Sequence, residues 1–529
     1  MPKVLFINPP VIDATVEFNR PVRWPSFSYA TPVLHPPLWL ATAAAYIREQ
    51  GFEVGLIDAI AERLSLESFL GKITGFRPDF LVFEISTASL PNDAQVISRC
   101  RHEFYSCDNL LPRVILVGPH CSALPEETLR SVPEADAVII GEYEISLKEY
   151  LLKGPVNTLG ICYRNRTRGV CEVVSTSLSQ DTRLRQSGVQ HLNSTQIINN
   201  GPRPFLANLD EIPFAARDLL PNEKYFDPVL DNPFTFVLAG RGCPHRCTYC
   251  HWPQVFTGHK YRLRSPGKVV DEIEDFWSRS PRLPRGTSYH FTCPPKPRWL
   301  SGRRWKSFLF NDDTFTANPD NVRAICNEII KRKLKVRWGA YTRADFDDES
   351  LLQTMKQAGC YLLGVGVESA SPAILKRVKK GWEINQAAET VKRLKRLGFQ
   401  VHLTFMFGLP GETQETIEQT IGWAKKLNPR SVQFSTAIPY PGTEFYDYLR
   451  KNDLLLAEVQ SGRFFLPMQP LYEYENLSAG DIGEAVLRAY RSYYFRLRYL
   501  SVGLKEMLRQ PVVFFKNLKR LISFSWGIH

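Results

Sequence analysis

Residues 234–252 read FTFVLAGRGCPHRCTYCHW, in which a short apolar run passes into a glycine-containing loop that carries three cysteines. The apolar run has the length and the β-branched and aromatic content of a buried strand. The cysteines are Cys243, Cys247 and Cys250, with the spacing Cys-x3-Cys-x2-Cys. A structural zinc ion takes four protein ligands, whereas three thiolates around an iron–sulfur cluster leave one iron without a protein ligand. The spacing therefore favours a cluster with one coordination position open for a substrate or cofactor.

Strand-like runs continue beyond this loop, and each of them precedes a helical pattern. Up to about residue 452 there are six such units, which begin with FTFVLAG, SFLFNDD, KVRWGAY, YLLGVGVES, QVHLTFMFG and SVQFSTAIP. Parallel strands joined by helices in this number predict a partial (β/α)6 barrel over residues 233–455. The chemistry of such barrels lies at the carboxyl ends of the strands, and the unusual residue groups of this half all fall there.

The first 152 residues show a similar alternation. The runs VLFIN, VGLID, FLVFEIS, RVILVG and ADAVIIGE alternate with helical patterns. This order predicts an α/β domain with a doubly wound, Rossmann-like parallel sheet, because each parallel connection has to travel back across one face. Ligands of such sheets bind beyond the carboxyl ends of the strands.

Three segments lack this rhythm. Residues 153–232 are rich in Asn, Arg, Ser and Pro, and we interpret them as a connector with some short strands. Residues 281–307 are rich in Pro and Arg and lie between a helix and a strand, so they form either a lid that faces the substrate or an inert insertion. Residues 456–529 are expected to form a helical C-terminal region.

Composition sets further limits. The 529 residues are 44% hydrophobic, which implies two or three globular domains. We expect a cytoplasmic protein, because no signal peptide pattern is visible and no run approaches the ~18 apolar residues of a spanning helix. The 11 cysteines favour reduced thiols over a disulfide framework. The formal charge of +12 permits an anionic partner but does not distinguish nucleic acid, acidic lipid and phosphate-bearing ligands.

The three-cysteine loop and the aromatic residues up to Trp252 resemble the radical S-adenosylmethionine superfamily, over about residues 233–452. The resemblance implies a 4Fe–4S cluster on Cys243, Cys247 and Cys250, with its open iron chelated by the amino and carboxylate groups of S-adenosylmethionine. In that family one electron from the cluster cleaves S-adenosylmethionine to methionine and a 5′-deoxyadenosyl radical, which abstracts hydrogen from the substrate.

Other strand ends match the same family in chain order. Glu368 resembles the strand-end acid that contacts S-adenosylmethionine, although a glutamate here could also simply face solvent. The turn 408–413 resembles the glycine-containing cofactor strand, in which an absent side chain lets the backbone approach adenine. Residues 311–313 match a further family position. The contacts to S-adenosylmethionine that the resemblance implies are Tyr249, Arg343, Glu368, Ser369, Gly408 and Pro439.

The first 150 residues resemble the cobalamin-binding domain that precedes the barrel in a large subgroup of this superfamily. The motif Asp-x-His-x-x-Gly, whose histidine binds cobalt in better-known corrinoid proteins, is absent, so a protein ligand to cobalt is not implied. The alternative is a doubly wound domain that has lost its ligand and only docks on the barrel. The strand-end residues that the resemblance assigns to cobalamin are Asp58, Ser86, Gly118, Pro119, His120, Gly141 and Glu142.

The segment 491–529 is basic and aromatic. It holds eight Lys or Arg and the single acid Glu506, interleaved with apolar residues. Such a pattern suits an amphipathic helix that packs on the barrel, or one that docks on an anionic membrane surface at the inner face of the membrane. No nucleic-acid-binding module is recognisable, and we expect no nucleic acid partner.

These observations predict a radical S-adenosylmethionine enzyme that modifies an unactivated carbon of a small or lipid-like metabolite, with cobalamin. The reaction is either methyl transfer or cyclisation, rearrangement or oxidation, since the subgroup includes anaerobic magnesium-protoporphyrin cyclases and hopanoid-tailoring enzymes. A flavodoxin or ferredoxin would supply electrons. The sequence identifies no catalytic residue. Two alternatives stay open: a corrinoid-binding sensor or carrier with an inactive barrel, and a zinc-stabilised interaction protein with a fourth ligand from His245, His251 or Cys293.

Overall fold

The computed structural model describes residues 1–12, 33–107, 111–165, 196–279, 305–457, 470–497 and 499, and two short strands, β2 (Glu17–Asn19) and β3 (Ser26–Ser28). Residues 281–304 of the expected insertion and the tail beyond residue 499 lie outside these ranges. Within the ranges described, no helix combines the length and the hydrophobicity needed to cross a lipid bilayer.

The N-terminal region contains the expected doubly wound sheet. Its parallel strands stand in the order β4-β1-β5-β6-β7, and β8 and β9, which come from the expected connector, extend the sheet in antiparallel orientation. The chain crosses from β4 on one side of β1 to β5 on the other, and sheets of this type bind ligands where the strand order reverses. The strands are β1 (Lys3–Asn8), β4 (Glu53–Asp58), β5 (Phe80–Glu84), β6 (Arg113–Val117), β7 (Ala137–Ile139), β8 (Ile161–Asn165) and β9 (Gln196–Asn199), and the helices are α1 (Leu38–Glu49), α2 (Ala59–Glu62), α3 (Leu66–Phe76), α4 (Leu90–Cys107), α5 (Pro119–Ala123), α6 (Pro125–Ser131) and α7 (Glu144–Lys153).

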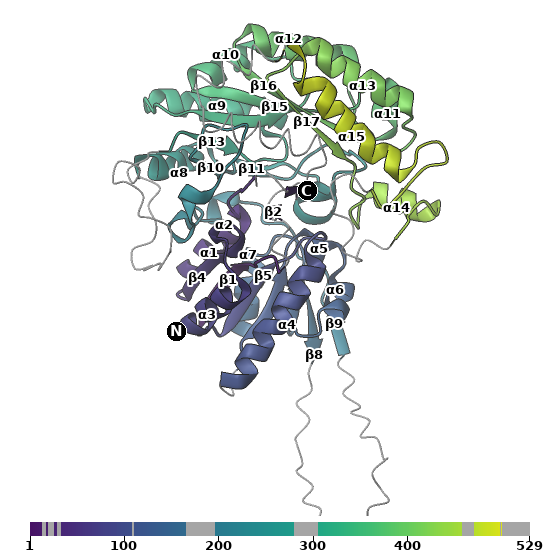
Figure 1. The fold of residues 1–529 in the computed structure, drawn as a ribbon. Coiled ribbons are helices and arrows are strands. Elements are labelled where there is room, and N and C mark those ends of the chain that lie inside the picture. Colours follow the sequence, from purple (N-terminus) through teal and green to yellow (C-terminus); the bar gives the residue numbers. More distant parts are fainter. Residues whose placement is uncertain are drawn as a thin grey trace, which may run out of the picture.

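The second region confirms the partial barrel. Six parallel strands stand in chain order, and Figure 1 shows them as an arch over the N-terminal region, with the helices on its outer side. The strands are β10 (Phe234–Val237), β13 (Ser307–Phe310), β14 (Trp338–Thr342), β15 (Cys360–Glu368), β16 (Gln400–Phe407) and β17 (Ser431–Thr436), and the helices are α8 (Pro266–Ser278), α9 (Pro319–Lys331), α10 (Glu349–Gln357), α11 (Pro372–Arg377), α12 (Ile384–Arg396), α13 (Gln414–Leu427) and α14 (Glu444–Lys451).

Short polar side chains set where several barrel helices begin. Each accepts a hydrogen bond from a backbone N–H in the first turn, which satisfies a group that the helix itself leaves unpaired. These N-caps are Ser265, Asn318, Asp348, Thr413 and Thr443. Because the helices start at defined residues, the loops between strand ends and helices have defined lengths, and these loops carry most of the expected site residues.

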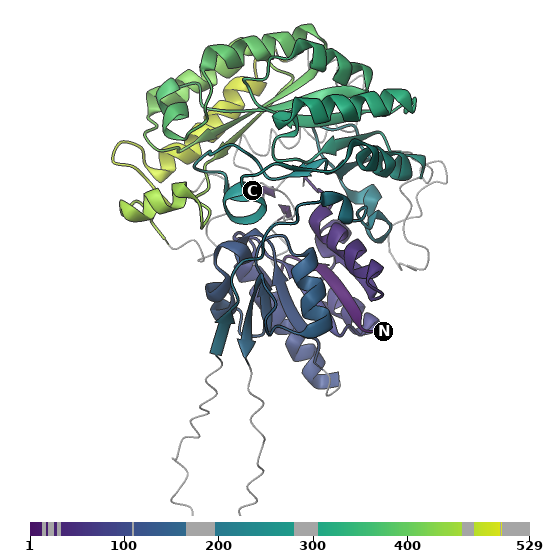
Figure 2. The ribbon, with the colours of Figure 1, turned by 180° about the vertical axis from the view of Figure 1, so that it is seen from behind.

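The two regions share one apolar core. Nine of the twelve residues of α1 are buried, as expected of a helix that is covered on more than one side. Trp39 and Leu40 of α1 belong to the same cluster of buried side chains as Phe236 of β10 and Leu362 of β15, which line the inner face of the barrel. A second cluster fills the space between the barrel strands and their outer helices. Figure 2 shows the close approach of the two regions from behind.

The helix α15 (Ala479–Tyr494) covers the last barrel strand. The hydroxyl of Tyr494 donates to the carbonyl of Val432 at 2.8 Å and accepts from its N–H at 3.0 Å, so it pairs backbone groups at the edge of the sheet. Tyr499 donates to the carbonyl of Arg430 at 3.1 Å. The start of the basic tail therefore packs on the barrel, and the membrane-docking alternative concerns the residues beyond it.

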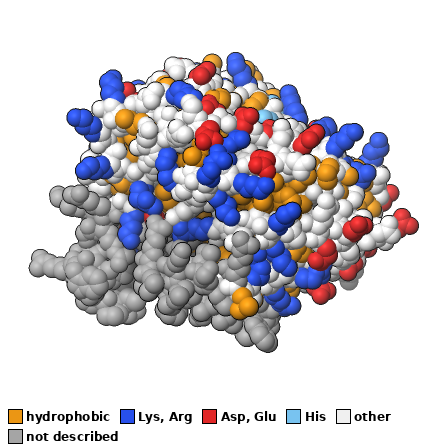
Figure 3. All heavy atoms as spheres, turned by 90° about the horizontal axis from the view of Figure 1, so that it is seen from above, with side chains coloured by type: hydrophobic (Ala, Val, Ile, Leu, Met, Phe, Trp, Pro, Cys, Tyr) orange, Lys and Arg blue, Asp and Glu red, His pale blue; other side chains and the backbone are white. Residues whose placement is uncertain are grey.

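The outer face of the barrel carries both signs of charge. Figure 3 shows Lys and Arg interspersed with Asp and Glu on this face. Arg332, for example, lies 2.7 Å from Asp271 and 3.0 Å from Glu274. The net positive charge of the chain is therefore not gathered in one patch on this face.

Candidate active site

A two-stranded ribbon closes the base of the cysteine loop. Its strands are β11 (Gly240–Arg241) and β12 (Arg262–Leu263), which pair in antiparallel orientation on either side of residues 242–261. Gly242 has a φ of 92°, and a Cβ there would stand 2.3 Å from the carbonyl oxygen of Lys260. Only glycine fits this approach of the two chain segments.

Two carboxylates that follow β13 bind the backbone at the start of the same loop. The side chain of Asp312 accepts the N–H of Ala239, and that of Asp313 accepts the N–H of Gly242, each at 3.1 Å. The amide of Gln254 donates to the carbonyls of Cys247, Thr248 and Cys250, at distances of 2.8 to 3.2 Å. These hydrogen bonds hold the backbone of the loop in one conformation. Gln254 carries no sequence signal of its own and was not among the expected site residues.

The three cysteine thiols differ in burial. Cys243 is buried and lies 3.5 Å from the hydroxyl of Thr314, whereas Cys247 and Cys250 are half-buried. Among the described residues, no three His, Cys, Asp or Glu side chains are close enough together to share one metal ion. The thiolates of a 4Fe–4S cluster each bind a different iron and need not converge on one point. Two half-buried thiols and one buried thiol on a loop held by hydrogen bonds therefore fit such a cluster.

A buried ion pair lies beside the cysteine loop. The carboxylate of Glu368 stands 2.8 Å from the ammonium of Lys380, which also donates to the hydroxyl of Tyr249 at 3.0 Å. Burial disfavours the Lys380 ammonium, but the charges of Glu368 and Cys247 outweigh it and hold the pKa of Lys380 above its ordinary value. Glu368 is therefore not a solvent-facing glutamate, and Lys380 is a site residue that the sequence did not indicate.

The end of β15 is shaped to present this carboxylate. The strand has a bulge between Gly366 and Glu368, and Glu368 has a φ of 68°. A Cβ on Gly366 would stand 2.6 Å from the carboxylate oxygen of Glu368, so glycine leaves the space that the side chain occupies. Ser369 is turned away into the protein, where its hydroxyl accepts the N–H of Ser371 at 3.2 Å.

Arg343 contacts the backbone beside the ion pair of Glu368 and Lys380. Its guanidinium forms a double hydrogen bond with Asp345, at 2.9 and 2.8 Å, and donates to the carbonyl of Lys380 at 2.9 Å. Burial, and then the charge of Arg343, lower the pKa of His245 in the cysteine loop to about 4. The loop after β14 and the cysteine loop therefore meet at one place.

Gly408 begins a turn that a buried carboxylate holds. Glu412 accepts the N–H of Gly408 at 2.5 Å and that of Leu409 at 3.3 Å. Burial raises the pKa of Glu412 to about 8, although these hydrogen bonds lower it. A Cβ on Gly408 would stand 2.3 Å from the hydroxyl of Tyr472. The turn is therefore tightly packed on the side of Tyr472, and glycine is required there.

The loop after β17 reaches the cysteine loop. Pro439 precedes Tyr440, whose ring lies 4.1 Å from the ring of His251. The N–H of Phe445 donates to the carbonyl of Thr248 at 3.0 Å. The first and last strands of the partial barrel thus contribute loops to the same site.

In the N-terminal region, Asp58 and Asn8 lie at neighbouring strand ends. Asp58 accepts the amide of Asn8 at 2.7 Å and the hydroxyl of Tyr225 at 2.9 Å, and burial raises its pKa to about 6. The side-chain oxygen Oδ1 of Asn8 is buried and has no hydrogen-bond partner among the described residues. An unpaired acceptor at the end of β1, where the strand order reverses, fits a ligand that carries amide donors, as cobalamin does.

The other expected cobalamin residues follow β5 and β6. Ser86 is hydrogen-bonded to Ser89, and the ring of His120 lies 3.1 Å from the hydroxyl of Thr87. Burial lowers the pKa of His120 to about 4, so its ring is neutral. Gly118, which precedes Pro119, has a φ of 111° and lies against the carbonyl of Ile85, where a Cβ would stand 2.7 Å away. These residues shape the turns of the sheet edge, and their contact with cobalamin stays a prediction.

Gly141 and Glu142 face the barrel. A Cβ on Gly141 would stand 3.9 Å from the carbonyl of Phe256, which lies in the π-helical turn η4 (Trp252–Thr257) after the cysteine loop. Glu142 forms two hydrogen bonds with Arg262, at 2.9 and 2.5 Å. The carboxylate of Glu142 is thus engaged by the ribbon below the cysteine loop.

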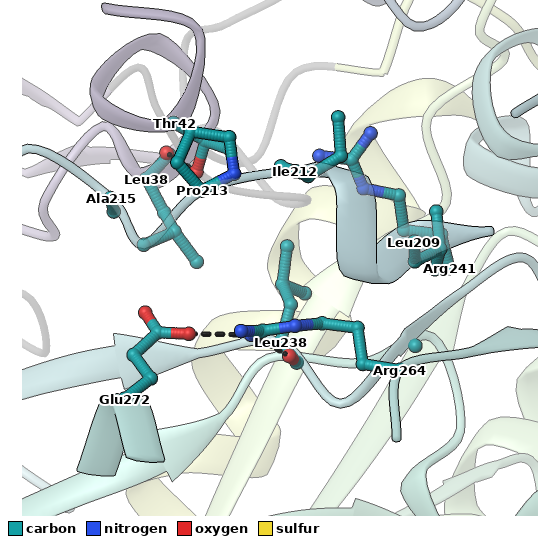
Figure 4. Close-up of a pocket in the computed structure, with 11 residues that line it drawn as sticks. Leu38, Thr42, Leu209, Ile212, Pro213, Ala215, Leu238, Arg241, Arg264 and Glu272 are labelled. Carbon is teal, nitrogen blue, oxygen red and sulfur yellow. Dashed lines mark hydrogen bonds and ion pairs between the residues drawn. The ribbon is translucent and has the colours of Figure 1, made fainter. Parts of the chain in front are cut away.

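A small pocket lies beside this junction (Figure 4). Its wall includes Leu38 and Thr42 of α1, Pro213 of the connector, and the ion pair between Arg264 and Glu272. The Arg264 and Glu272 side chains are 2.5 Å apart, and Arg217 of the connector lies 2.7 Å from the other oxygen of Glu272. The pocket is therefore bounded by elements of both regions.

Two family models match the chain. The model described as Radical SAM superfamily matches residues 237–424, and the model described as B12 binding domain matches residues 30–151.

Individual relatives cover nearly the whole chain. An uncharacterized methyltransferase of Pyrococcus horikoshii is 31% identical over 473 residues, with 89% of this chain and 90% of the relative aligned. The anaerobic magnesium-protoporphyrin IX monomethyl ester cyclase of Rubrivivax gelatinosus is 25% identical, with 88% and 75% aligned. Among solved structures, the cobalamin-dependent S-adenosylmethionine radical enzyme OxsB has the same fold, with a TM-score of 0.65, 15% identity, and 98% of this chain and 72% of that chain covered.

Proposed function

Because this chain belongs to the radical SAM superfamily and carries a B12-binding domain before its barrel, we propose that it is a methyltransferase that acts on an unactivated carbon. Membership implies a 4Fe–4S cluster, S-adenosylmethionine and cobalamin as cofactors. Together these groups supply a hydrogen-abstracting radical and a transferable methyl group. The protein binds and orients them and excludes water from the site.

The observation that carries the proposal is the place of the cysteine loop. Cys243, Cys247 and Cys250 stand on a loop whose base is bound directly to the loop after β7 of the B12-binding domain. Thiolates on this loop would hold the cluster, and the strand ends that face it would hold the corrinoid. A substrate carbon between the two would be within reach of both sites.

The residues beside the loop suit S-adenosylmethionine. This cofactor brings an ammonium, a carboxylate and a sulfonium into a water-poor site, so its charges need partners there. Glu368 and Lys380 supply one charge of each sign, 2.8 Å apart, and the hydroxyl of Tyr249 lies within hydrogen-bond distance of Lys380. We propose that these side chains bind the amino acid end of S-adenosylmethionine, with the Gly408 turn and Pro439 forming the neighbouring walls.

Methyl transfer is favoured over cyclisation by the relatives. The methyltransferase relative aligns over nine-tenths of its own length at 31% identity, against 25% identity for the cyclase. The proposed substrate is a small or lipid-like molecule, and the basic, aromatic sequence of residues 500–529 supports a contact with an anionic membrane surface. A flavodoxin or ferredoxin is proposed as electron donor, since the cluster needs one electron for each cleavage.

The first test is a pair of cysteine variants. We expect Cys247→Ala to abolish 5′-deoxyadenosine formation from S-adenosylmethionine with dithionite, because one iron loses its ligand. The matched control is Cys326→Ala, which removes a thiol buried in the outer barrel core away from the loop. This control variant should lower the free energy of unfolding slightly and leave the cleavage of S-adenosylmethionine unchanged. Undiminished cleavage in the Cys247 variant would refute the cluster assignment.

Metal analysis of the same proteins separates the alternatives. After anaerobic reconstitution we expect about four irons per chain in the wild type and in the control, the count of a 4Fe–4S cluster. Zinc without iron would support a zinc-stabilised interaction protein. Bound corrinoid without cleavage of S-adenosylmethionine would support a sensor or carrier with an inactive barrel.

A further inference from the structure

Both strands of the ribbon below the cysteine loop carry an arginine. Arg241 and Arg262 lie directly opposite each other in the antiparallel pair β11–β12. Arg241 stands two residues before Cys243, and Arg262 follows the end of the loop. These two side chains therefore lie at the base of the loop, one on each of its strands.

Two glutamates of the N-terminal region receive these arginines. Glu142 binds Arg262 through both carboxylate oxygens, at 2.9 and 2.5 Å, and lies 3.5 Å from Arg241. Glu144 binds Arg241 at 2.6 Å. Glu142 lies in the turn after β7 and Glu144 is the first residue of α7, at the carboxyl edge of the sheet. The four side chains form one network that bridges the two regions.

The network is closed off from solvent. The four side chains are between 2% and 7% exposed. The guanidinium of Arg241 lies 4.1 Å from the centre of the Trp39 ring on α1, and that of Arg262 lies 4.8 Å from the Phe205 ring. Arg262 also donates to the carbonyls of Leu206 and Thr257, at 2.9 and 3.0 Å. Each guanidinium is thus held by several directional contacts at once.

Adhesion between the regions does not require this network. The shared apolar core around α1 already joins them, and buried ion pairs of this kind stabilise a fold no better than well-packed apolar residues. Apolar contacts are not directional, whereas paired guanidinium and carboxylate groups allow only one register. The contribution specific to the network is therefore orientation.

We propose that Arg241, Arg262, Glu142 and Glu144 are positioning residues, which hold the cysteine loop and the loop after β7 in one fixed relation. The inference rests on the proposed function, because only a protein with both cofactors needs a fixed distance between the cluster and the corrinoid. The network makes the two cofactor sites a single rigid unit. A shift at one loop is transmitted to the other.

Hydrogen exchange on the full-length protein tests this transmission in both directions. Glu144→Gln is a change in the N-terminal region, and we expect it to raise the exchange rate of the ribbon amides by about tenfold. Arg262→Gln is a change in the barrel, and we expect it to raise the exchange rate of residues 141–146 to a similar extent. Arg262→Lys keeps the positive charge but loses the planar group that binds both carboxylate oxygens, so it should raise the exchange rate less than Arg262→Gln does. Exchange that changes only in the mutated segment would overturn the proposal.

A carboxylate of the same helix is the matched control. Glu149 of α7 pairs with Arg203 of the connector at 2.5 Å and is part-buried, and among the described residues no hydrogen bond or ion pair joins it to the ribbon. We expect Glu149→Gln to leave exchange in the ribbon unchanged. A rise as large as that in Glu144→Gln would show that loss of any carboxylate from α7 loosens the ribbon, and would overturn the specific role of the network.

Spectroscopy of the loaded protein gives a second readout. With hydroxocobalamin and the cluster bound and both reduced, the cob(II)alamin resonance should relax faster through its coupling to the cluster. We expect this enhancement to fall in Arg262→Gln, since the coupling depends steeply on distance. An equal enhancement in wild type and variant would overturn the positioning role. If the wild type binds neither iron nor corrinoid, the proposed function fails, while the exchange experiment still decides the network.

Discussion

At the scale of single residues, the ion pair of Glu368 and Lys380 allows a sharp test. We expect Glu368→Gln to lower the free energy of unfolding by about 3 kcal/mol, because it leaves the Lys380 ammonium buried without its counter-charge. The double variant Glu368→Gln/Lys380→Met removes that charge as well and should recover part of the loss. Urea unfolding measures both effects.

The same variants separate stability from binding. If the pair also binds S-adenosylmethionine, the double variant should regain stability but not cleavage of the cofactor. A double variant that is as unstable as the single one would contradict the electrostatic explanation.

The two members of this pair differ in how well they could be predicted. Glu368 ends a strongly apolar strand, so its position at the site followed from the strand itself. Lys380 comes 12 residues later, in a short segment after α11 with no periodic pattern. Its role depends on a contact through space with Glu368 and Tyr249, and a lysine in such a segment otherwise has no distinguishing feature.

At the scale of elements, the ribbon and its loop depend on Gly242. We expect Gly242→Ala to strain the loop by roughly 1–3 kcal/mol, because alanine disfavours a φ of 92° and its Cβ would meet the carbonyl of Lys260 at 2.3 Å. The iron and sulfide content after reconstitution should fall. The control is Gly267→Ala in the first turn of α8, where a Cβ would meet no atom within 4 Å.

The expected results of the two glycine variants point in opposite directions. Alanine at Gly267 restricts the unfolded chain and suits a helix, so it should keep the iron content and stabilise the protein by up to about 1 kcal/mol. Full iron content in the Gly242 variant would contradict the claim that the close approach to Lys260 shapes the cluster site.

The long parallel strands were predictable, and so was the presence of short strands in the connector, but the pairing of the short antiparallel strands was not. All six barrel strands fall on the apolar runs of the sequence, because a strand buried on both faces reads as a continuous apolar stretch. The strands β11 and β12 have two residues each and are separated by the whole cysteine loop. Their pairing is set by contacts across that loop. The attachment of β8 to β7, and of β9 to β8, likewise depends on contacts between segments that carry no pairing signal of their own.

At the scale of the whole molecule, the shared core predicts joint unfolding. The apolar cluster around α1 includes residues of the N-terminal sheet and of the inner barrel face, so neither region can open without exposing the other. We expect peptides from β5 and from β14 to lose hydrogen-exchange protection at the same urea concentration. Two separate midpoints would contradict a common core.

The order of the strands along the chain, the partial barrel, the doubly wound sheet and the three-cysteine loop could all be predicted from the sequence. These features are local, since each depends on the periodicity or spacing of residues close together in the chain. The tertiary structure alone shows that Lys380 joins Glu368, that Glu142 and Glu144 bind the arginines of the ribbon, and that α1 lies in a core shared by both regions. Each of these contacts joins segments that are far apart in sequence or that carry no periodic pattern, and it forms because a buried charge or an apolar face requires a partner.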